Sequence, residues 1–135
     1  MAILIDTSVL IAWERRDLFP AELIEVLPNE PTGISSITAS ELLLGVHRAN
    51  TEERRLKRFA SVEAVFSRFP ILAFDLLTAR AHASLSGQIA AAGRPIGAHD
   101  LIIAATAIAN GYDILTDNPR DFARVPGLIV RRPDW

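Results

Sequence analysis

The sequence contains no cysteine among its 135 residues. This absence excludes disulfide scaffolds, zinc–thiolate sites and thiol nucleophiles, and it favours a reducing compartment, so we expect a cytoplasmic protein. Any metal ion must then be bound by oxygen atoms or imidazole. Long apolar runs are also lacking. The stretch 101–109 is less than half of what a membrane span requires, and the apolar N-terminal run has no basic segment before it and is interrupted by Asp6. We therefore expect a soluble protein with no membrane contact.

The chain also lacks a large excess of charge of one sign, and it lacks low-complexity sequence. Half of the residues are hydrophobic, 22% are charged and the net charge is −2, which excludes a disordered chain. The length predicts a single domain that spans residues 1–135. Of the 14 basic residues only Lys57 is a lysine, and arginine favours planar, bidentate contacts with phosphate if these side chains face a polyanion.

Short apolar runs alternate with helical patterns along the chain. The runs predict strands at 3–5, 33–36, 71–74, 112–116 and 128–130. The patterns between them predict helices over 7–13, from Pro20 to the prolines at 28–31, from a Thr38–Glu41 capping box onward, and over 51–69, 76–92, 99–110 and 119–124. This alternation is typical of an α/β fold, and we expect a three-layer α/β/α sandwich with a mainly parallel central sheet.

Four acidic residues occupy equivalent places in this pattern. Asp6 ends the first predicted strand, and Glu41 lies in the first turn of the helix after the second strand. Asp100 lies at the start of the apolar helix predicted at 99–110, and Asp117 follows the fourth strand. In parallel α/β sheets these places meet at the carboxyl ends of the strands, where ligands bind.

Each acid also has a purely structural interpretation. Asp6 and Asp100 would cap helices, Glu41 would complete the capping box with Thr38, and Asp117 would begin a turn. Together, however, four carboxylates repel one another unless a cation lies between them. Oxygen-only ligands suit Mg²⁺ or Mn²⁺, so the sequence predicts a site for a hard divalent cation.

The acids lie in four blocks that resemble the PIN-domain ribonucleases, and in particular the VapC toxins of prokaryotic toxin–antitoxin pairs. The blocks are Ile3–Ser8, Ser36–Gly45, Ile96–Ala105 and Ile114–Asn118 with Asp121–Phe122, and they span nearly the whole chain. The resemblance implies a PIN-like fold and a Mg²⁺- or Mn²⁺-dependent endoribonuclease. Such an enzyme hydrolyses RNA phosphodiesters to 5′-phosphate and 3′-hydroxyl ends. It also implies that Asp6, Glu41 and Asp100 bind the metal.

The fourth acidic position varies in this family. Asp117, Asn118 and Asp121 are all candidates for it here, and Asp117 is the one we favour from the sequence. Whether one or two ions act is left open.

Several neighbours are candidates for orienting the acids or for contacting substrate. Thr7 and Ser8 are hydroxyl residues beside Asp6 that orient a ligand or serve the helix start, and Thr116 precedes Asp117. Arg94 and Arg120 flank the expected acidic edge and suit a phosphate. His99 contacts substrate or completes a helix start. A metal-free histidine pair is not expected, because His47, His82 and His99 fall on three different helices and only His99 is near the acids.

The resemblance also implies partners. These are an RNA substrate, a VapB-type antitoxin and a second copy of the chain in a homodimer. Apolar residues at Trp13, Leu18–Phe19 and Leu42–Leu44 are candidates for a groove that holds a partner helix. The alternative function is a catalytically silent PIN-like interaction module whose acids merely cap helices.

Overall fold

Five short strands form one sheet in the order β3-β2-β1-β4-β5, and each neighbouring pair is parallel. The computed structural model describes residues 2–16, 27 and 29–134. The predicted helix from Pro20 and the apolar pair Leu18–Phe19 lie outside these residues. The strands are β1 (Ala2–Ile5), β2 (Thr32–Ser35), β3 (Ile71–Leu72), β4 (Tyr112–Leu115) and β5 (Val130–Arg131).

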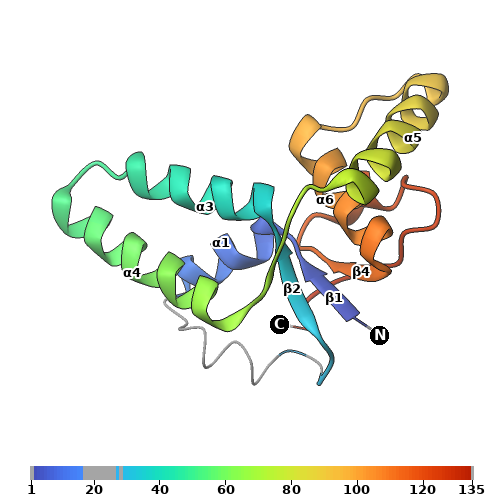
Figure 1. Ribbon diagram of the computed structural model, residues 1–135. Coiled ribbons are helices and arrows are strands. Elements are labelled where there is room, and N and C mark those ends of the chain that lie inside the picture. Colours follow the sequence, from blue (N-terminus) through green and yellow to red (C-terminus); the bar gives the residue numbers. More distant parts are fainter. Residues whose placement is uncertain (1, 17–26, 28, 135) are drawn as a thin grey trace.

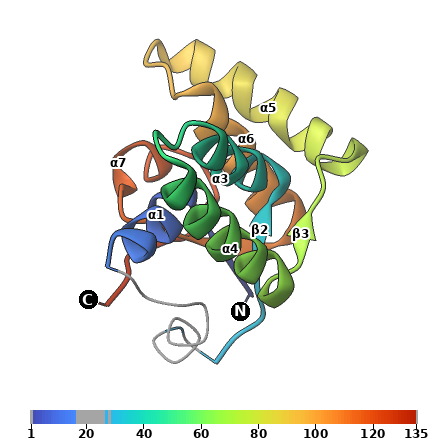
Figure 2. The ribbon, with the colours of Figure 1, turned by 90° about the vertical axis from the view of Figure 1, so that its left-hand side faces the viewer.

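Helices cover both faces of this sheet. They are α1 (Thr7–Arg15), α3 (Ser36–His47), α4 (Glu52–Arg68), α5 (Leu76–Ala92), α6 (Ala98–Asn110) and the short α7 (Pro119–Phe122). In Figure 1, α1, α3 and α4 lie on one side of the strands, and α5 and α6 lie on the other. Figure 2 shows α3 and α4 side by side in front of the sheet. The predicted α/β/α sandwich is therefore confirmed.

The alternation of side chains along β1 explains the two layers. Ile3 and Ile5 pack with the buried residues of α1, α3 and α4, whereas Leu4 packs with those of α5 and α6. All three are fully buried, because β1 is the central strand and successive side chains point to opposite faces. A central strand covered on both faces must be apolar throughout, as the sequence Ile3-Leu4-Ile5 is.

The helix boundaries follow local signals with one exception. Side chains of Thr51 and Asp75 accept hydrogen bonds from the first turns of α4 and α5. Gly93 and Gly111 end α5 and α6 with φ of 74° and 70°, a conformation that glycine adopts without strain.

The exception is the start of α3, where the predicted Thr38–Glu41 capping box is wrong. Ser35 is the cap, and its Oγ accepts from the Thr38 backbone N–H at 3.1 Å. The last residue of β2 is extended, as a cap must be, so the helix begins three residues earlier than predicted. Glu41 consequently lies in the second turn of α3.

The strand order places the ends of β1 and β4 next to each other. Ile5 is paired with Leu115, and the Asp6 backbone N–H donates to the Leu115 carbonyl at 2.8 Å. Strands β2 and β3 extend the sheet from β1 on one side, and β4 and β5 extend it on the other. The order of strands in the sheet therefore changes direction between β1 and β4. Such a switch point is where open α/β sheets bind ligands.

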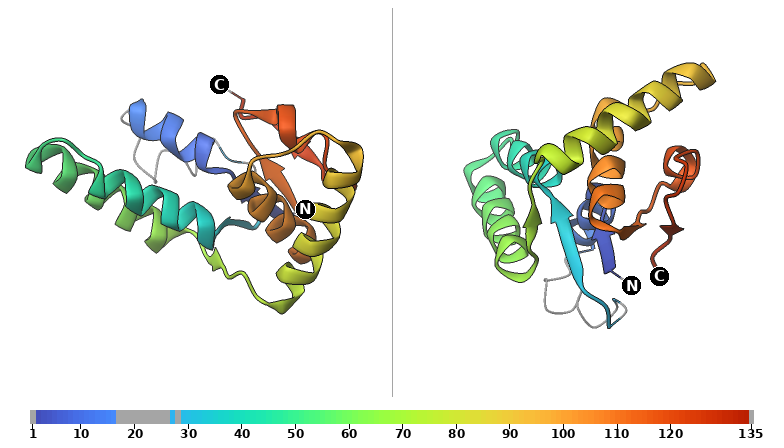
Figure 3. Two further views of the ribbon diagram at one scale, coloured as in Figure 1. Left: turned by 90° about the horizontal axis from the view of Figure 1, so that it is seen from above. Right: turned by 45° about the vertical axis from the view of Figure 1, so that its right-hand side comes forward.

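The helices α3 and α4 form a long hairpin that extends away from the sheet, as Figure 3 shows from above. Within the described residues, no helix combines the length and apolar character that a membrane crossing needs.

Candidate active site at the carboxyl edge of the sheet

Asp6 is buried at the switch point, with only 4% of its surface exposed. It occupies the cap position of α1, but its side chain makes no capping hydrogen bond. Instead, its Oδ2 accepts hydrogen bonds from Ser8 Oγ at 2.7 Å and from Thr116 Oγ1 at 2.8 Å. The other oxygen, Oδ1, has no hydrogen-bond partner within the described residues. The structural interpretation of Asp6 as a helix cap is therefore wrong, and the side chain is held by hydroxyl groups.

The two hydroxyl groups that hold Asp6 are themselves oriented by the backbone after β4. Ser8 Oγ accepts from the Asp117 N–H at 3.1 Å, and Thr116 Oγ1 accepts from the Asn118 N–H at 3.0 Å. Each hydroxyl hydrogen is thus directed at Asp6. The loop after β4 thus orients these hydroxyl groups through its backbone N–H groups, while the side chains of Asp117 and Asn118 are exposed.

Glu41 is held in the same manner from α1. Its Oε1 accepts from Thr7 Oγ1 at 3.0 Å, and Thr7 Oγ1 also lies 3.0 Å from Thr38 Oγ1. Thr38 and Ser35 are completely buried, and their hydroxyl oxygens are 3.0 Å apart. A chain of hydroxyl groups therefore runs from the end of β2 to Glu41. The sequence pattern indicated Thr7 as an orienting hydroxyl but gave Ser35 no role and Thr38 only a capping role, because both roles depend on where α3 begins.

Asp100 lies in the first turn of α6, and the cap of this helix is Gly97, which has no side chain that could accept a capping hydrogen bond. Burial, together with the charges of Asp6, Asp121 and Glu41, raises the pKa of Asp100 from 3.8 to about 6, against the opposing effect of His99. The carboxylates predicted to share one edge thus act on each other electrostatically. His99 Nδ1 is 3.7 Å from Glu41 Oε2, so this histidine also lies at the edge.

The fourth position differs from our expectation in one respect. Asp121, in α7, is among the charges that raise the pKa of Asp100, and Asp117 is not. Asp121 is partly buried, and its Oδ1 is 3.3 Å from Arg124 Nη1, whereas the side chain of Asp117 is exposed. These observations favour Asp121 over Asp117.

The donor set suits a hard divalent cation in its chemistry. It consists of carboxylates from four separate elements, and Asp6 Oδ1 and Glu41 Oε2 accept no hydrogen bond from the described residues. No three acidic or histidine side chains in those residues lie close enough together to hold one ion as they stand. Mutual repulsion keeps like charges apart, so binding an ion requires the carboxylates to turn toward it.

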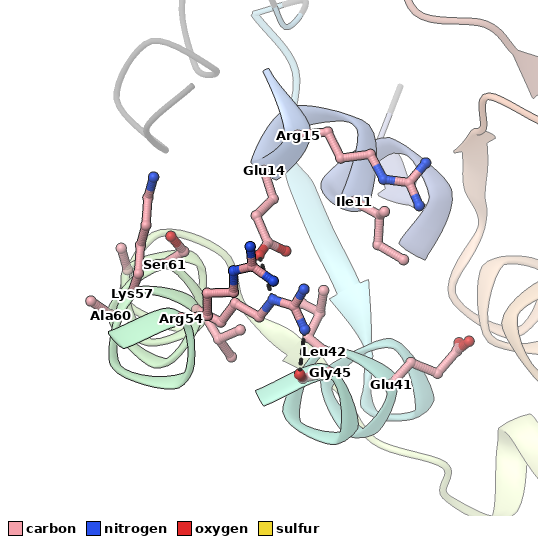
Figure 4. Close-up of a pocket in the computed structure, with 13 residues that line it drawn as sticks. Ile11, Glu14, Arg15, Glu41, Leu42, Gly45, Arg54, Lys57, Ala60 and Ser61 are labelled. Atoms are coloured by element: carbon pink, nitrogen blue, oxygen red, sulfur yellow. Dashed lines mark hydrogen bonds and ion pairs between the residues drawn. The ribbon is translucent and has the colours of Figure 1, made fainter. Parts of the chain in front are cut away.

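A first cleft, of about 630 Å³, opens between α1, α3 and α4 with Glu41 at its margin (Figure 4). Apolar side chains that include Ile11 and Leu42 line it. Across it, Arg58 binds the Gly45 carbonyl at 3.0 Å and forms an ion pair with Glu14. Trp13, one of the residues expected in a partner groove, is instead buried in the core with 3% of its surface exposed.

A second cleft, of about 480 Å³, lies between the loop before α6 and α7. It contains Arg94 and Arg120, the two arginines that sequence analysis placed beside the acids.

Comparisons with known proteins agree with this architecture. The model of the PIN domain matches residues 3–128. Ribonuclease VapC1 of Rickettsia felis is 40% identical over 130 residues, which are 96% of this chain and 95% of the relative. The tRNA(fMet)-specific endonuclease VapC of Shigella flexneri is 38% identical over 102 residues, 76% of this chain and 74% of the relative.

Among solved structures, the DNA-bound VapBC of Salmonella typhimurium superposes with a TM-score of 0.85 at 28% identity and covers 98% of both chains. The fold, the match to the family model and the sequence identity with relatives over most of the chain lead to the same conclusion. The chain belongs to the PIN-domain family.

Proposed function

We propose that this chain is a divalent-metal-dependent endoribonuclease and the toxin of a type II toxin–antitoxin pair, acting in the cytoplasm with Mg²⁺ or Mn²⁺. The observation that carries the proposal is the electrostatic coupling of Asp100 to Asp6, Glu41 and Asp121 at the carboxyl edge. Acids that merely cap helices would be satisfied by backbone N–H groups, but Asp6 makes no such bond and Glu41 accepts from a hydroxyl. This argues against the silent interaction module.

The residues divide into three roles in this proposal. Asp6, Glu41 and Asp100 bind the ion, with Asp121 rather than Asp117 as the fourth acid. Thr7, Ser8 and Thr116 fix the orientation of the carboxylates through the hydroxyl bonds described above. When bound, a hard dication would offset the negative charge of the phosphodiester and would lower the pKa of a water molecule that it binds.

The relatives support the assignment of partners. The solved neighbours include VapBC complexes, so we propose a VapB-type antitoxin as a partner of this chain. The first cleft, which combines apolar side chains with charged ones at its mouth, suits a segment of that antitoxin.

We also propose a homodimer. Four large apolar side chains in β3, in the link after it and at the start of α5 are 43–66% exposed, and they belong to Ile71, Phe74, Leu76 and Leu77. Strand β3 is also an outer strand of the sheet. A soluble monomer rarely presents such a group of side chains to water, whereas an interface would cover it.

The test is mapping of RNA ends after expression without a partner. We expect the wild-type chain to arrest growth and to produce new 5′-phosphate ends, and Asp6→Asn to do neither while keeping the folded circular dichroism spectrum. With purified protein, cleavage should stop in a chelator and resume with added Mg²⁺ or Mn²⁺. New ends that are equally abundant with Asp6→Asn, or cleavage that persists in chelator, would contradict the proposal.

A further inference from the structure

The second cleft carries an excess of positive charge beside the acidic edge. Three arginines, Arg94, Arg120 and Arg124, line it together with one acidic residue, Asp121. We refer to it as the arginine cleft. Asn118, which also lines it, joins it to the active edge, because the Asn118 backbone N–H donates to Thr116 Oγ1 at 3.0 Å and this hydroxyl donates to Asp6 Oδ2 at 2.8 Å. In Figure 3 the short α7 lies beside the loop that leads into α6.

Arg124 is engaged within the protein. Its guanidinium donates to the backbone carbonyls of Arg94 and Pro95, the latter at 3.2 Å, and forms an ion pair with Asp121. These bonds tie the loop before α6 to α7, so the two walls of the cleft keep a fixed relation. They also use the negative charge of Asp121 to balance Arg124.

Arg94 and Arg120 are not engaged in this way. Both side chains are exposed, and neither guanidinium has a hydrogen bond or an ion pair within the residues that the structure describes. Two unpaired guanidinium groups that line one cleft repel each other. An anion between them relieves that repulsion, and each group offers several N–H donors in a planar fork that matches the oxygens of a phosphate.

We propose that Arg94 and Arg120 form a binding site for a backbone phosphate of single-stranded RNA, adjacent to the phosphodiester that is cleaved. The inference rests on the proposed ribonuclease function and extends it to a substrate contact. A carboxylate edge repels a polyanion, so RNA that crosses it needs a positive anchor nearby, and the arginine cleft supplies one. Because phosphate contacts carry no sequence information, the site holds the strand in register without selecting bases.

The experiment measures binding of a labelled oligouridylate by fluorescence anisotropy in Mg²⁺ over a range of salt concentrations. The full chain carries Asp6→Asn so that the RNA stays intact. Arg94→Gln and Arg120→Gln are compared with Arg68→Gln, a matched loss of one exposed arginine at the end of α4. Phe69 and Pro70 follow Arg68 and lead into the start of β3, so this control lies at the opposite edge of the sheet.

We expect Arg94→Gln and Arg120→Gln each to weaken binding about three- to fivefold. Each should also reduce the slope of log K against log salt by about 0.7 relative to Arg68→Gln. Equal slopes in all three variants would overturn the proposal. So would variants that bind RNA normally but lose affinity for an acidic partner protein, because the cleft would then recognise carboxylates of a protein.

The ribonuclease proposal fails separately. If Asp6→Asn cleaves RNA as fast as the wild type, that proposal is wrong, and the comparison of slopes can still be made with uncleavable DNA of the same length. Loss of slope with DNA would keep the phosphate site and reject only its link to RNA cleavage. An unchanged slope would reject the phosphate site as well.

Discussion

Asp100 is a residue whose ionisation works against the fold when no cation is present. Its pKa rises from 3.8 to about 6, so the unfolded chain loses this proton at a lower pH than the folded chain does. Between these two values the folded state binds more protons. Its free energy of unfolding therefore falls as pH rises through this window and stays reduced above it.

We predict that Asp100→Asn removes this pH dependence. In chelator at pH 7 the variant should be more stable than the wild type by about 1 kcal/mol, a value reduced from the full pKa shift because the side chain is partly solvated. At pH 3 the two proteins should be equally stable. Urea unfolding at a series of pH values measures this, and a variant that is less stable at pH 7 would show that the charge of Asp100 stabilises the first turn of α6 instead.

Thr116 is a residue whose effect on function should exceed its effect on stability. It is completely buried and directs its hydroxyl at Asp6 Oδ2. Thr116→Val keeps the shape and removes this bond, so we predict a loss of about 10- to 100-fold in cleavage rate at limiting Mg²⁺.

The matched control for Thr116 is Thr106→Val. This equally buried hydroxyl bonds the Ile102 carbonyl within α6, away from the acids. Titration of the cleavage rate with Mg²⁺ distinguishes the two variants. The same Mg²⁺ dependence in both would mean that Thr116 has only a structural role.

At the scale of elements, α3 links the core to the site. Its cap, Ser35, is the last residue of β2, and Glu41 lies further along the same helix. Helix α4 is capped in the same way by Thr51 but carries none of the four acids that act on one another at the edge. The two helices therefore separate the effect of a lost cap from an effect on the site.

We predict that Ser35→Ala and Thr51→Ala each lower the free energy of unfolding by about 1 kcal/mol. Only Ser35→Ala should also reduce the rise in melting temperature that Mg²⁺ produces, because it disturbs the hydroxyl chain that reaches Glu41. Thermal unfolding with and without Mg²⁺ tests this. An equal Mg²⁺ response in both variants would contradict the role assigned to Ser35.

The elements were predictable where the signal is local. The apolar run Ile3–Ile5 and the glycines after α5 and α6 determine their elements within a few residues, and the predicted strands and helices of the described residues are found. The start of α3 was not predictable in this way. Two overlapping hydroxyl motifs, Ser35 and Thr38, satisfy the same capping rule, and the pairing of β2 with β1 decides between them.

The candidate site shows the same division. Strand ends and helix starts predicted that Asp6, Glu41 and Asp100 would share the carboxyl edge of the sheet, because position in a parallel sheet follows from topology. The charges of Asp6 and Glu41 do act on Asp100, although the three side chains do not converge on one point. The preference for Asp121 over Asp117 and the bonds of Arg124 to the loop before α6 depend on how α7 packs. No spacing in the sequence encodes that packing.

At the scale of the whole molecule, the exposed apolar side chains at β3 and α5 bear on assembly. We predict that Leu76→Lys converts the proposed homodimer into a monomer, because a charge in an apolar interface is left without a partner. Leu56→Lys on α4, at 59% exposure against 66% for Leu76, is the control and should remain dimeric. Sedimentation equilibrium measures both, and a dimer that survives Leu76→Lys would place the interface elsewhere.

The pairing of β1 with β4 also has a consequence for synthesis of the protein. Asp6 and Thr116, which share a hydrogen bond, are 110 positions apart. At about 5–20 residues per second, a ribosome makes the second of them roughly 5–20 s after the first. A nascent or truncated product that ends before β4 therefore has Asp6 without the neighbours that hold it. The carboxylate edge is completed only when β4 and α7 have left the ribosome.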